Sequence, residues 1–212
     1  MNYDILQPIS QGVDGAYDEE NQRIQKIADE LDRLCCLHEG ESGDSQTNGS
    51  RLEIEQRAAE QFAKTNGMWI PLDSIFDLGV PGPSGNENDT YVSDNTIFKV
   101  NNLFNSGSIT ALLKRVLFHN QIFPNTAYRF YGFTGYDGRS VMPVLQQDRV
   151  SNARPATQSQ IDAYMSALSF SKLSTEGKFS NGQYVVWDIV PRNVLTDKDG
   201  DLYVVDAEIA LV

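Results

Sequence analysis

The chain has 212 residues, a formal net charge of −12 and 40% hydrophobic residues. This length allows one domain, or two small lobes, with a sizeable core. The acidic excess argues against non-specific binding to nucleic acid or to an anionic membrane, because both draw on surplus Lys and Arg. The N-terminus lacks the basic and apolar stretches of a signal peptide, and no apolar run predicts a membrane span.

The two cysteines, Cys35 and Cys36, are neighbours in the chain. A disulfide between adjacent residues is strained and rare, and no His or Cys pattern around them indicates zinc. We therefore expect reduced thiols in a cytoplasmic compartment.

Residues 1–66 are predicted to form a helical appendage. Apolar residues recur at three- and four-residue steps over residues 17–38, which is typical of a helix, and a second helix is expected over residues 51–65. The polar, Gly/Ser-rich stretch near residues 40–50 indicates a flexible linker. The two helices either pack on the main domain or bind a protein partner, and the sequence leaves both alternatives open.

Residues 67–145 are predicted to form a lobe with a five-stranded antiparallel sheet and one helix. The runs MWIPL, SIFDLGV, DTYV and TIFKV, separated by turn residues, predict strands. A helix is expected over residues 106–120, followed by strands over 128–134 and 141–145 with a hairpin turn at Asp137-Gly138.

Residues 146–212 are predicted to form a smaller second lobe, which makes the whole chain an α+β protein. A helix is expected over residues 158–170. Strands over residues 194–196 and 202–205 flank a turn at Asp199-Gly200.

The stretch WDIVPRNVLTDKDGDLYVVDA, residues 187–207, has the order and spacing of a phosphoryl-transfer site. Such chemistry needs a hydroxyl held in line and negative charge neutralised on the phosphates. Asp188 is therefore the candidate base, and Asn193 and Asp206 are candidate Mg²⁺ ligands, because Mg²⁺ needs few protein oxygens. Each residue alone has an ordinary alternative role in a turn, a loop or a strand end. Their occurrence together at this spacing favours function.

Two upstream features suit phosphate binding. Gly79, Gly82 and Gly85 fall between predicted strands and permit a backbone that closes over phosphates, although Gly/Pro clusters are more often plain turns and no P-loop sequence follows. Lys99 lies inside the apolar run TIFKV, where a buried ammonium is costly unless it meets an anion such as a nucleotide phosphate. The alternative is a Lys on an edge strand that faces water.

In this order the glycine turn, Lys99, the helix, the Asp188–Asn193 loop and Asp206 resemble the protein-kinase-like fold. The segments SGNENDTYV, FKVNN, HNQIFPNTAYRFYGFTG, WDIVPRNVL and YVVDAEI resemble more narrowly the small kinase-like domain of bacterial polyvalent proteins from mobile elements and phages, over about residues 67–209. The resemblance implies a minimal bilobal protein-kinase-like fold with a reduced second lobe, which binds ATP and Mg²⁺. It also implies that MPVLQQ, residues 142–147, connects the lobes. The backbone of Val144 and Leu145 would then face adenine, with Met142 behind it.

The chain also departs from the kinase pattern. Trp187 precedes Asp188 in place of a His-Arg pair, and Ala-Glu follows Asp206. The helix expected over residues 106–120 contains no Glu to pair with Lys99. Glu87 is the nearest acidic substitute, and the alternative for it is a solvated turn carboxylate. With no Ala-Pro-Glu motif after Asp206, we expect that an acceptor is not gripped as protein kinases grip peptides.

Three classes of function follow from these observations. The first is an ATP- and Mg²⁺-dependent phosphotransferase whose acceptor is a protein or a small molecule. The second is a degenerate module that binds nucleotide or protein without turnover. The third is a structural protein that acts through its N-terminal helices. The presence of Lys99, Asp188, Asn193 and Asp206 together argues against the third class.

Overall fold

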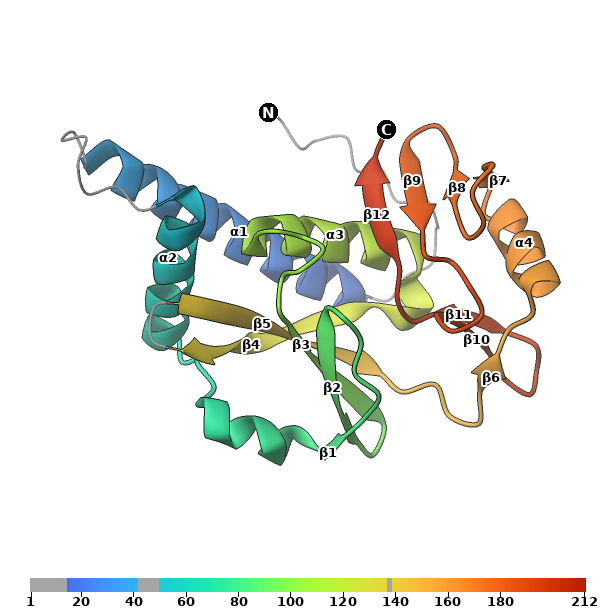
Figure 1. Ribbon diagram of the computed structural model, residues 1–212, viewed down its shortest axis with the longest axis horizontal. Coiled ribbons are helices and arrows are strands. Elements are labelled where there is room, and N and C mark those ends of the chain that lie inside the picture. Colours follow the sequence, from blue (N-terminus) through green and yellow to red (C-terminus); the bar gives the residue numbers. More distant parts are fainter. Residues whose placement is uncertain (1–14, 42–49, 137–138) are drawn as a thin grey trace. The chain divides into compact units, whose positions relative to one another are not determined.

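The computed structural model describes residues 15–41, 50–136 and 139–212, and the chain divides into two compact units (Figure 1). The helix–sheet unit contains residues 18–117 and 128–149, and the C-terminal unit contains residues 118–127 and 150–212. Within the described ranges, no helix is long and apolar enough to cross a membrane. Most of the predicted linker and the predicted turn at Asp137-Gly138 lie outside the described residues.

The helix–sheet unit has one antiparallel sheet with the strand order β1-β2-β3-β5-β4. The strands are β1 (Val80–Pro81), β2 (Asn88–Ser93), β3 (Thr96–Asn101), β4 (Tyr128–Tyr136) and β5 (Arg139–Asp148). The helices are α1 (Gly15–Glu41), α2 (Arg51–Thr65), the 3₁₀ helix η1 (Leu72–Leu78) and α3 (Ile109–Ile122), the last of which continues into the C-terminal unit. The predicted five-stranded antiparallel sheet is therefore confirmed.

The helices α1, α2 and α3 cover one face of this sheet because their apolar stripes are buried against it. Ile24 and Leu31 of α1 and Leu113 of α3 are fully buried in one core with Phe130 and Leu145 of the sheet. Figure 1 shows α1 and α3 running side by side over the strands. Of the two alternatives for the N-terminal helices, the structure has packing on their own chain, and their apolar stripes are occupied there.

Polar side chains of α1 and α2 form hydrogen bonds with backbone groups of the sheet that are not bonded to a neighbouring strand. Glu20 accepts a hydrogen bond from Phe130 N (2.8 Å), and Arg23 donates one to Phe130 O (2.9 Å). Phe130 lies on β4, an edge strand of the sheet. Gln56 likewise accepts from Val141 N and donates to Val141 O (3.4 Å). These contacts satisfy buried or edge backbone groups that would otherwise lack a partner.

The strands predicted from MWIPL and SIFDLGV are wrong. Trp69 forms only an isolated bridge to Phe133, and η1 replaces most of the second run. Leu72, Ile75 and Leu78 recur every three residues, which is the period of a 3₁₀ helix. Ile75 and Leu78 face a small core on the other side of the sheet, where Val100 and Val144 also pack.

The C-terminal unit combines α4 (Gln158–Ala167) and the 3₁₀ turn η2 (Pro124–Thr126) with two small sheets, ordered β11-β10-β6 and β12-β9-β8-β7. Their strands are β6 (Arg154–Pro155), β7 (Ser171–Lys172), β8 (Phe179–Ser180), β9 (Tyr184–Trp187), β10 (Val194–Thr196), β11 (Leu202–Val204) and β12 (Glu208–Leu211). The strands predicted around Asp199-Gly200 are confirmed as β10 and β11, whereas β9 and β12 were not predicted.

The helices predicted over residues 106–120 and 158–170 correspond to α3, which differs at both ends and stops at Ile122, and to α4, which differs at its C-terminal end. α3 begins at Ile109 rather than at residue 106, because Gly107 has a φ of +72°. α4 ends at Ala167 rather than at residue 170. Ser169, with a φ of +66°, turns the chain out of the helix, and Phe170 N then donates to Met165 O (2.9 Å).

Candidate functional site

Asp188 and Asn193 belong to one loop between β9 and β10. Asn193 Nδ2 donates to Asp188 Oδ2 (2.8 Å) and to the Asp188 carbonyl (2.9 Å). Arg192 donates to the other carboxylate oxygen of Asp188. The Asp188 side chain is still 39% exposed. The carboxylate is therefore held in one orientation and remains open to a ligand.

The backbone of Asp188 is strained. Its φ of +62° lies in the left-handed region, which Asp and Asn tolerate better than most other non-glycine residues. A tight turn follows, in which Val190 N donates to Asp188 O (3.1 Å) and Asn193 N donates to Val190 O (2.8 Å). Backbone strain of this kind concentrates at functional sites, so the observation supports a role for Asp188.

Two strand pairings bring Asp206 to the same end of the C-terminal unit. Val205 N donates to Asn193 O (2.9 Å), which extends the β10–β11 ladder and places Val205 opposite Asn193, with Asp206 one residue further along the chain. In the β9–β12 ladder, Trp187 pairs with Glu208. Asp188 directly follows Trp187, and Asp206 lies just before Glu208, so both carboxylates lie where these ladders end.

Two side chains near Asp188 have oxygen atoms that could bind a ligand. Among the described residues, the Asp206 carboxylate makes no hydrogen bond or ion pair, and Asn193 Oδ1 accepts no hydrogen bond. No group of three or more His, Cys, Asp or Glu side chains arranged for a metal occurs in the described ranges. One carboxylate and one amide oxygen nevertheless suit Mg²⁺, which keeps water and phosphate ligands.

The far end of the β10–β11 hairpin is fixed by Asp197. This carboxylate accepts hydrogen bonds from Asp199 N and Asp201 N, both at 3.0 Å, and from Tyr203 Oη at 3.2 Å. Desolvation raises the pKa of Asp197, but the bonds from Asp201 and Asp199 outweigh it, and the pKa lies below its ordinary value. The turn is therefore held by an ionised Asp197 at neutral pH.

Gly177 supports the Asp188 loop, and this contact gives a prediction about stability. Its carbonyl accepts a hydrogen bond from Ile189 N (3.0 Å), and a Cβ at Gly177 would lie 2.7 Å from Val190 Cγ1. Gly177→Ala is expected to lower the free energy of unfolding by about 2–4 kcal/mol, from left-handed strain plus overpacking. Urea unfolding measures the loss.

Gly182→Ala is the matched control for Gly177→Ala. Gly182 has a similar φ of +86°, but a Cβ there would meet no atom within 4 Å. The control is therefore expected to lose only about 1–2 kcal/mol from strain. Equal losses in the two variants would contradict the contact between Gly177 and the loop.

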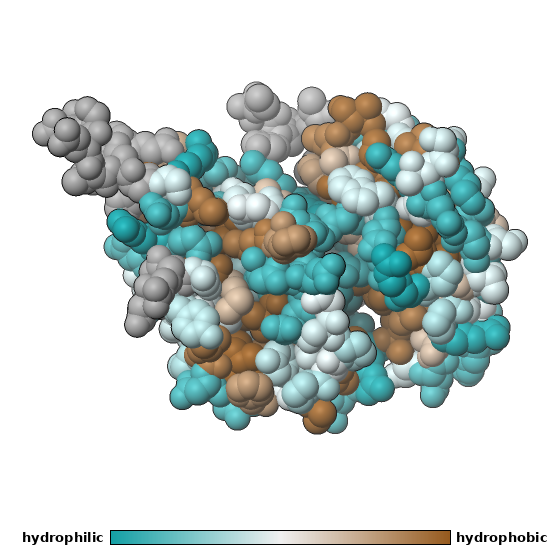
Figure 2. Space-filling view, in the orientation of Figure 1, coloured by the Kyte–Doolittle hydropathy of each residue, from teal (hydrophilic) through white to brown (hydrophobic). Residues whose placement is uncertain are grey.

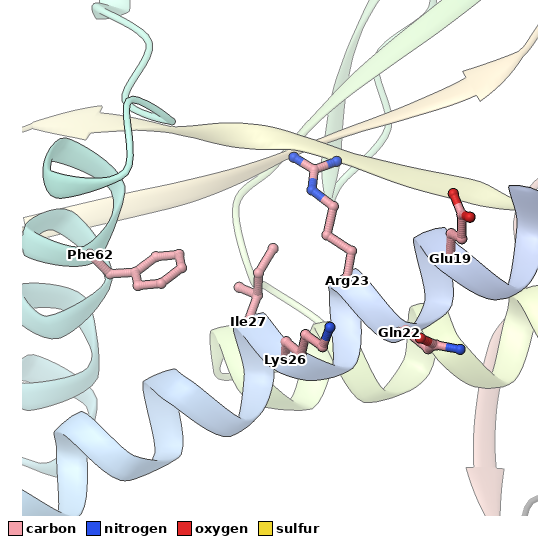
Figure 3. A pocket seen from close by; sticks show the side chains of 6 residues that line it. All are labelled: Glu19, Gln22, Arg23, Lys26, Ile27 and Phe62. Atoms are coloured by element: carbon pink, nitrogen blue, oxygen red, sulfur yellow. The ribbon is translucent and has the colours of Figure 1, made fainter.

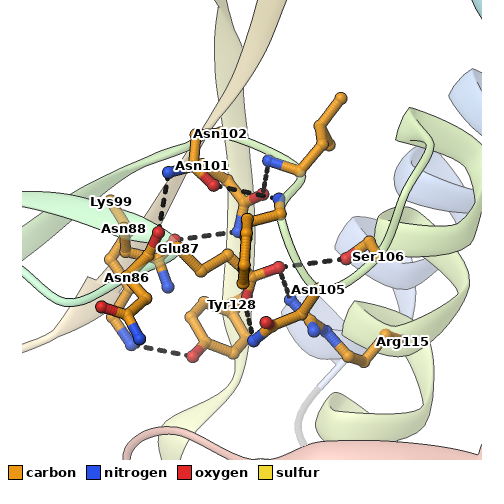
Figure 4. Close-up of polar contacts among 12 residues, drawn as sticks. Asn86, Glu87, Asn88, Lys99, Asn101, Asn102, Asn105, Ser106, Arg115 and Tyr128 are labelled. Carbon is orange, nitrogen blue, oxygen red and sulfur yellow. Dashed lines mark hydrogen bonds and ion pairs between the residues drawn. The ribbon is translucent and has the colours of Figure 1, made fainter.

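Lys99 lies in the helix–sheet unit, inside the sheet. It pairs in register with Leu145 of β5, whose side chain is in the core beneath the helices, so Lys99 lies on that face. Lys99 is 7% exposed, and its Nζ donates to Tyr128 Oη at 2.8 Å (Figure 4). The alternative of an edge-strand Lys facing water is wrong, because β3 lies between β2 and β5.

Glu87 is buried, so its alternative as a solvated turn carboxylate is also wrong. It forms an ion pair with Arg115 of α3 at 2.8 Å and accepts hydrogen bonds from Asn105 Nδ2 and Ser106 Oγ, each at 3.2 Å. Figure 4 shows these groups converging on its carboxylate.

Gly82 and Gly85 lie in the turn between β1 and β2. Gly82 N donates to Thr90 O (2.9 Å) and Gly85 N donates to Asn88 O (3.0 Å). A Cβ at Gly82 would lie 2.7 Å from Thr90 Oγ1, so close packing within the hairpin requires glycine there. The N–H groups of these two glycines are already bonded in the hairpin. N–H groups that bind a phosphate would therefore have to come from other residues of the turn.

The predicted lobe connector MPVLQQ is wrong, because Met142, Val144 and Leu145 lie within β5. Val144 pairs with Val100 on one side and Gly132 on the other, and Leu145 is likewise paired on both sides. An inner strand has its backbone bonded in both directions, so the backbone of Val144 and Leu145 does not face an adenine ring. The boundary between the two units falls after Arg149.

One hollow of the helix–sheet unit lies away from the predicted site residues. Figure 3 shows it between α1 and α2, with the Phe62 ring directed toward Ile27 and the Arg23 guanidinium directed toward the sheet. The lining of the hollow is Glu19, Gln22, Arg23, Lys26, Ile27 and Phe62.

On the face drawn in Figure 2, apolar surface lies over η1, and Phe76 and Val80 are 67% and 72% exposed.

Comparison with family models identifies the relationship of the chain. Residues 53–212 match the family described as serine/threonine/tyrosine kinase found in polyvalent proteins. The match covers well over half of the chain, including most of α2 and all the predicted site residues, and excludes α1. A comparison with curated proteins gives no match.

Proposed function

Because the chain belongs to the family of serine/threonine/tyrosine kinases found in polyvalent proteins, we propose that it is a phosphotransferase that uses ATP and Mg²⁺. The observation that carries the proposal is the Asp188 group. The Asp188 carboxylate is held in one orientation and is 39% exposed. It lies in one loop with Asn193, whose Oδ1 accepts no hydrogen bond among the described residues. The β10–β11 ladder brings Asp206, whose carboxylate has no partner among those residues either, to the same end of the unit.

Each residue has a defined part in this proposal. Asp188 accepts the proton of the acceptor hydroxyl, whose oxygen bonds to the γ-phosphorus while the bond to the ADP oxygen breaks. Asn193 orients Asp188 through Nδ2, and its Oδ1 together with the Asp206 carboxylate would hold Mg²⁺. Lys99 binds phosphate oxygens. Bound Mg²⁺ supplies neutralisation of the phosphate charge.

The finer assignment of the fold belongs to the same proposal. The helix–sheet unit corresponds to the first lobe of a minimal bilobal kinase-like fold, and the C-terminal unit corresponds to a reduced second lobe. The family description favours a Ser, Thr or Tyr hydroxyl as acceptor, on a protein or a small molecule. Neither Cys35 nor Cys36 forms a disulfide within the described residues, which is compatible with the proposed cytoplasmic compartment.

Nucleotide binding gives the first test. Mg²⁺-ATP at a hundredfold excess over Kd is expected to raise the free energy of unfolding by about 2.7 kcal/mol, measured as a thermal shift. Asp206→Ala should lose most of this shift, and EDTA should abolish the metal-dependent part. Asp199→Ala is the matched control on the same hairpin, since the exposed Asp199 side chain pairs with the exposed Lys198 (3.8 Å) and the variant keeps the backbone N–H that Asp199 donates to Asp197. No shift in the parent protein would refute the proposal.

One observation favours a second function, a nucleotide-binding module without turnover. Both oxygens of Asp188 already accept hydrogen bonds, one from Arg192 and one from Asn193. A proton from an acceptor hydroxyl would have to share or displace one of these hydrogen bonds. A parent protein that binds Mg²⁺-ATP but transfers no phosphate would select this function over the first.

A further inference from the structure

A buried ion pair joins the turn that contains Gly82 and Gly85 to helix α3. The Arg115 and Glu87 side chains are 13% and 7% exposed, and the pair measures 2.8 Å. The same Glu87 oxygen accepts from Ser106 Oγ, and the second oxygen accepts from Asn105 Nδ2. A buried carboxylate held by an ion pair and two further donors cannot leave this place without a large loss.

The loop between β3 and α3 holds the chain on both sides of Glu87. Asn102 N donates to Glu87 O (2.9 Å), and Asn102 Nδ2 donates to Asn86 O (2.8 Å). Asn101 Nδ2 donates to Asn88 Oδ1 (2.9 Å). Figure 4 shows this set as one network between the returning arm of the turn and the loop. The returning arm is therefore fixed at residues 86–88.

The outgoing arm of the turn is bonded to the returning arm. β1 has two residues, Val80 and Pro81, that pair with β2, and beyond them Gly82 N donates to Thr90 O (2.9 Å) and Gly85 N donates to Asn88 O (3.0 Å). A two-residue strand that includes Pro contributes few ladder hydrogen bonds. The outgoing arm therefore follows the returning arm, which β3 pairs along β2 and which the Glu87–Arg115 ion pair ties to α3.

We propose that Glu87 is a positioning residue, which together with Arg115 fixes the glycine turn against α3 so that the turn can bind nucleotide phosphates. The inference rests on the proposed function. In protein kinases the helix supplies a Glu to the strand Lys. Here α3 supplies a cation, and the carboxylate lies at the base of the turn. The ion pair therefore joins the helix and the turn with the charges exchanged, since the helix carries the cation and the turn carries the anion. Lys99 has a contact of its own, with Tyr128.

The test combines hydrogen exchange with nucleotide kinetics on the full chain. Glu87→Gln, Arg115→Gln and the double variant are compared with the parent. Each single variant is expected to raise amide exchange over residues 82–88 about tenfold without nucleotide, and the double variant no further, as for a coupled pair. The same variants should raise KM for ATP about tenfold with little change in kcat, since the turn binds but does not react.

Asp89→Asn is the matched control, because Asp89 is an exposed carboxylate on the same strand as the returning arm. It should change neither exchange nor KM. Exchange in α2 serves as an internal reference for global unfolding. Unchanged exchange over residues 82–88, or additive effects in the double variant, would overturn the anchor. Raised exchange with an unchanged KM would overturn its link to phosphate binding. Failure of the parent to bind ATP would refute the proposed function instead, while the exchange data would still decide the anchor.

Discussion

Asp188→Asn is expected to reduce phosphoryl transfer by about 10²–10⁴-fold and to leave nucleotide binding and stability near those of the parent. An amide cannot accept the proton of the acceptor hydroxyl. Asn tolerates the φ of +62° as Asp does, its side-chain oxygen can accept the hydrogen bond from Asn193 Nδ2, and the exposed Arg192, which loses its acceptor, is solvated instead. The substitution therefore removes the base and keeps the loop.

The measurement is transfer of radiolabelled phosphate from ATP to the protein itself and to added acceptors, with thermal shift as the check on binding. Asp162→Asn is the matched control, since Asp162 is a surface carboxylate of the same unit that pairs with Lys172 (2.6 Å). Full activity in Asp188→Asn would exclude Asp188 as the base. Absence of activity in the parent as well, with binding intact, would select the nucleotide-binding module.

The sequence predicts Asp188, Asn193 and Asp206 as candidate site residues, but it predicts only part of the structure around them. The motif from Asp188 to Asp206 predicted the β10–β11 hairpin, because both its strands and its turn are local. The β9–β12 ladder, which closes the other side, was missed because its strands are separated by the whole motif. The apolar run Tyr184–Trp187 directly before Asp188 is the signal that predicts β9.

Local periodicity also explains which parts of the helix–sheet unit were predictable. α1 was predicted because Ile24, Ile27 and Leu31 form a stripe that any partner surface would bury. η1 was missed because a period of three over seven residues also fits an irregular apolar run. The backbone of β5 is bonded on both sides because β3 and β4 lie on either side of it. The local sequence MPVLQQ alone could therefore not predict this pairing.

Buried polar residues on α2 were invisible for a related reason. Glu55 and Gln56 are 5% and 8% exposed, although polar helix residues usually face solvent. Their partners lie 54 and 85 positions further along the chain, on α3 and β5. No pattern within α2 identifies such contacts, since only the packed structure brings these elements together.

Glu55→Ala is expected to lower the free energy of unfolding by about 3 kcal/mol, because two backbone donors would lose their charged acceptor. Glu55 Oε2 accepts from Ile109 N (2.9 Å), while Oε1 accepts from Thr110 N (2.9 Å) and Thr110 Oγ1 (2.8 Å). These are the first N–H groups of α3, and a carboxylate there also offsets the helix dipole. The loss should appear in urea unfolding as a lower midpoint at an unchanged m-value.

Glu53→Ala on the same helix is the matched control, because Glu53 caps the start of α2 from an exposed position. Water replaces an exposed cap, so the control should lose only about 0.5–1 kcal/mol. Equal losses would show that Glu55 does not hold α3. A larger loss for Glu55→Ala would mean that α2 fixes the start of the helix that carries Arg115. Displacing α2 would then disturb α3, and through Arg115 and Glu87 the glycine turn, without touching any residue proposed to bind nucleotide.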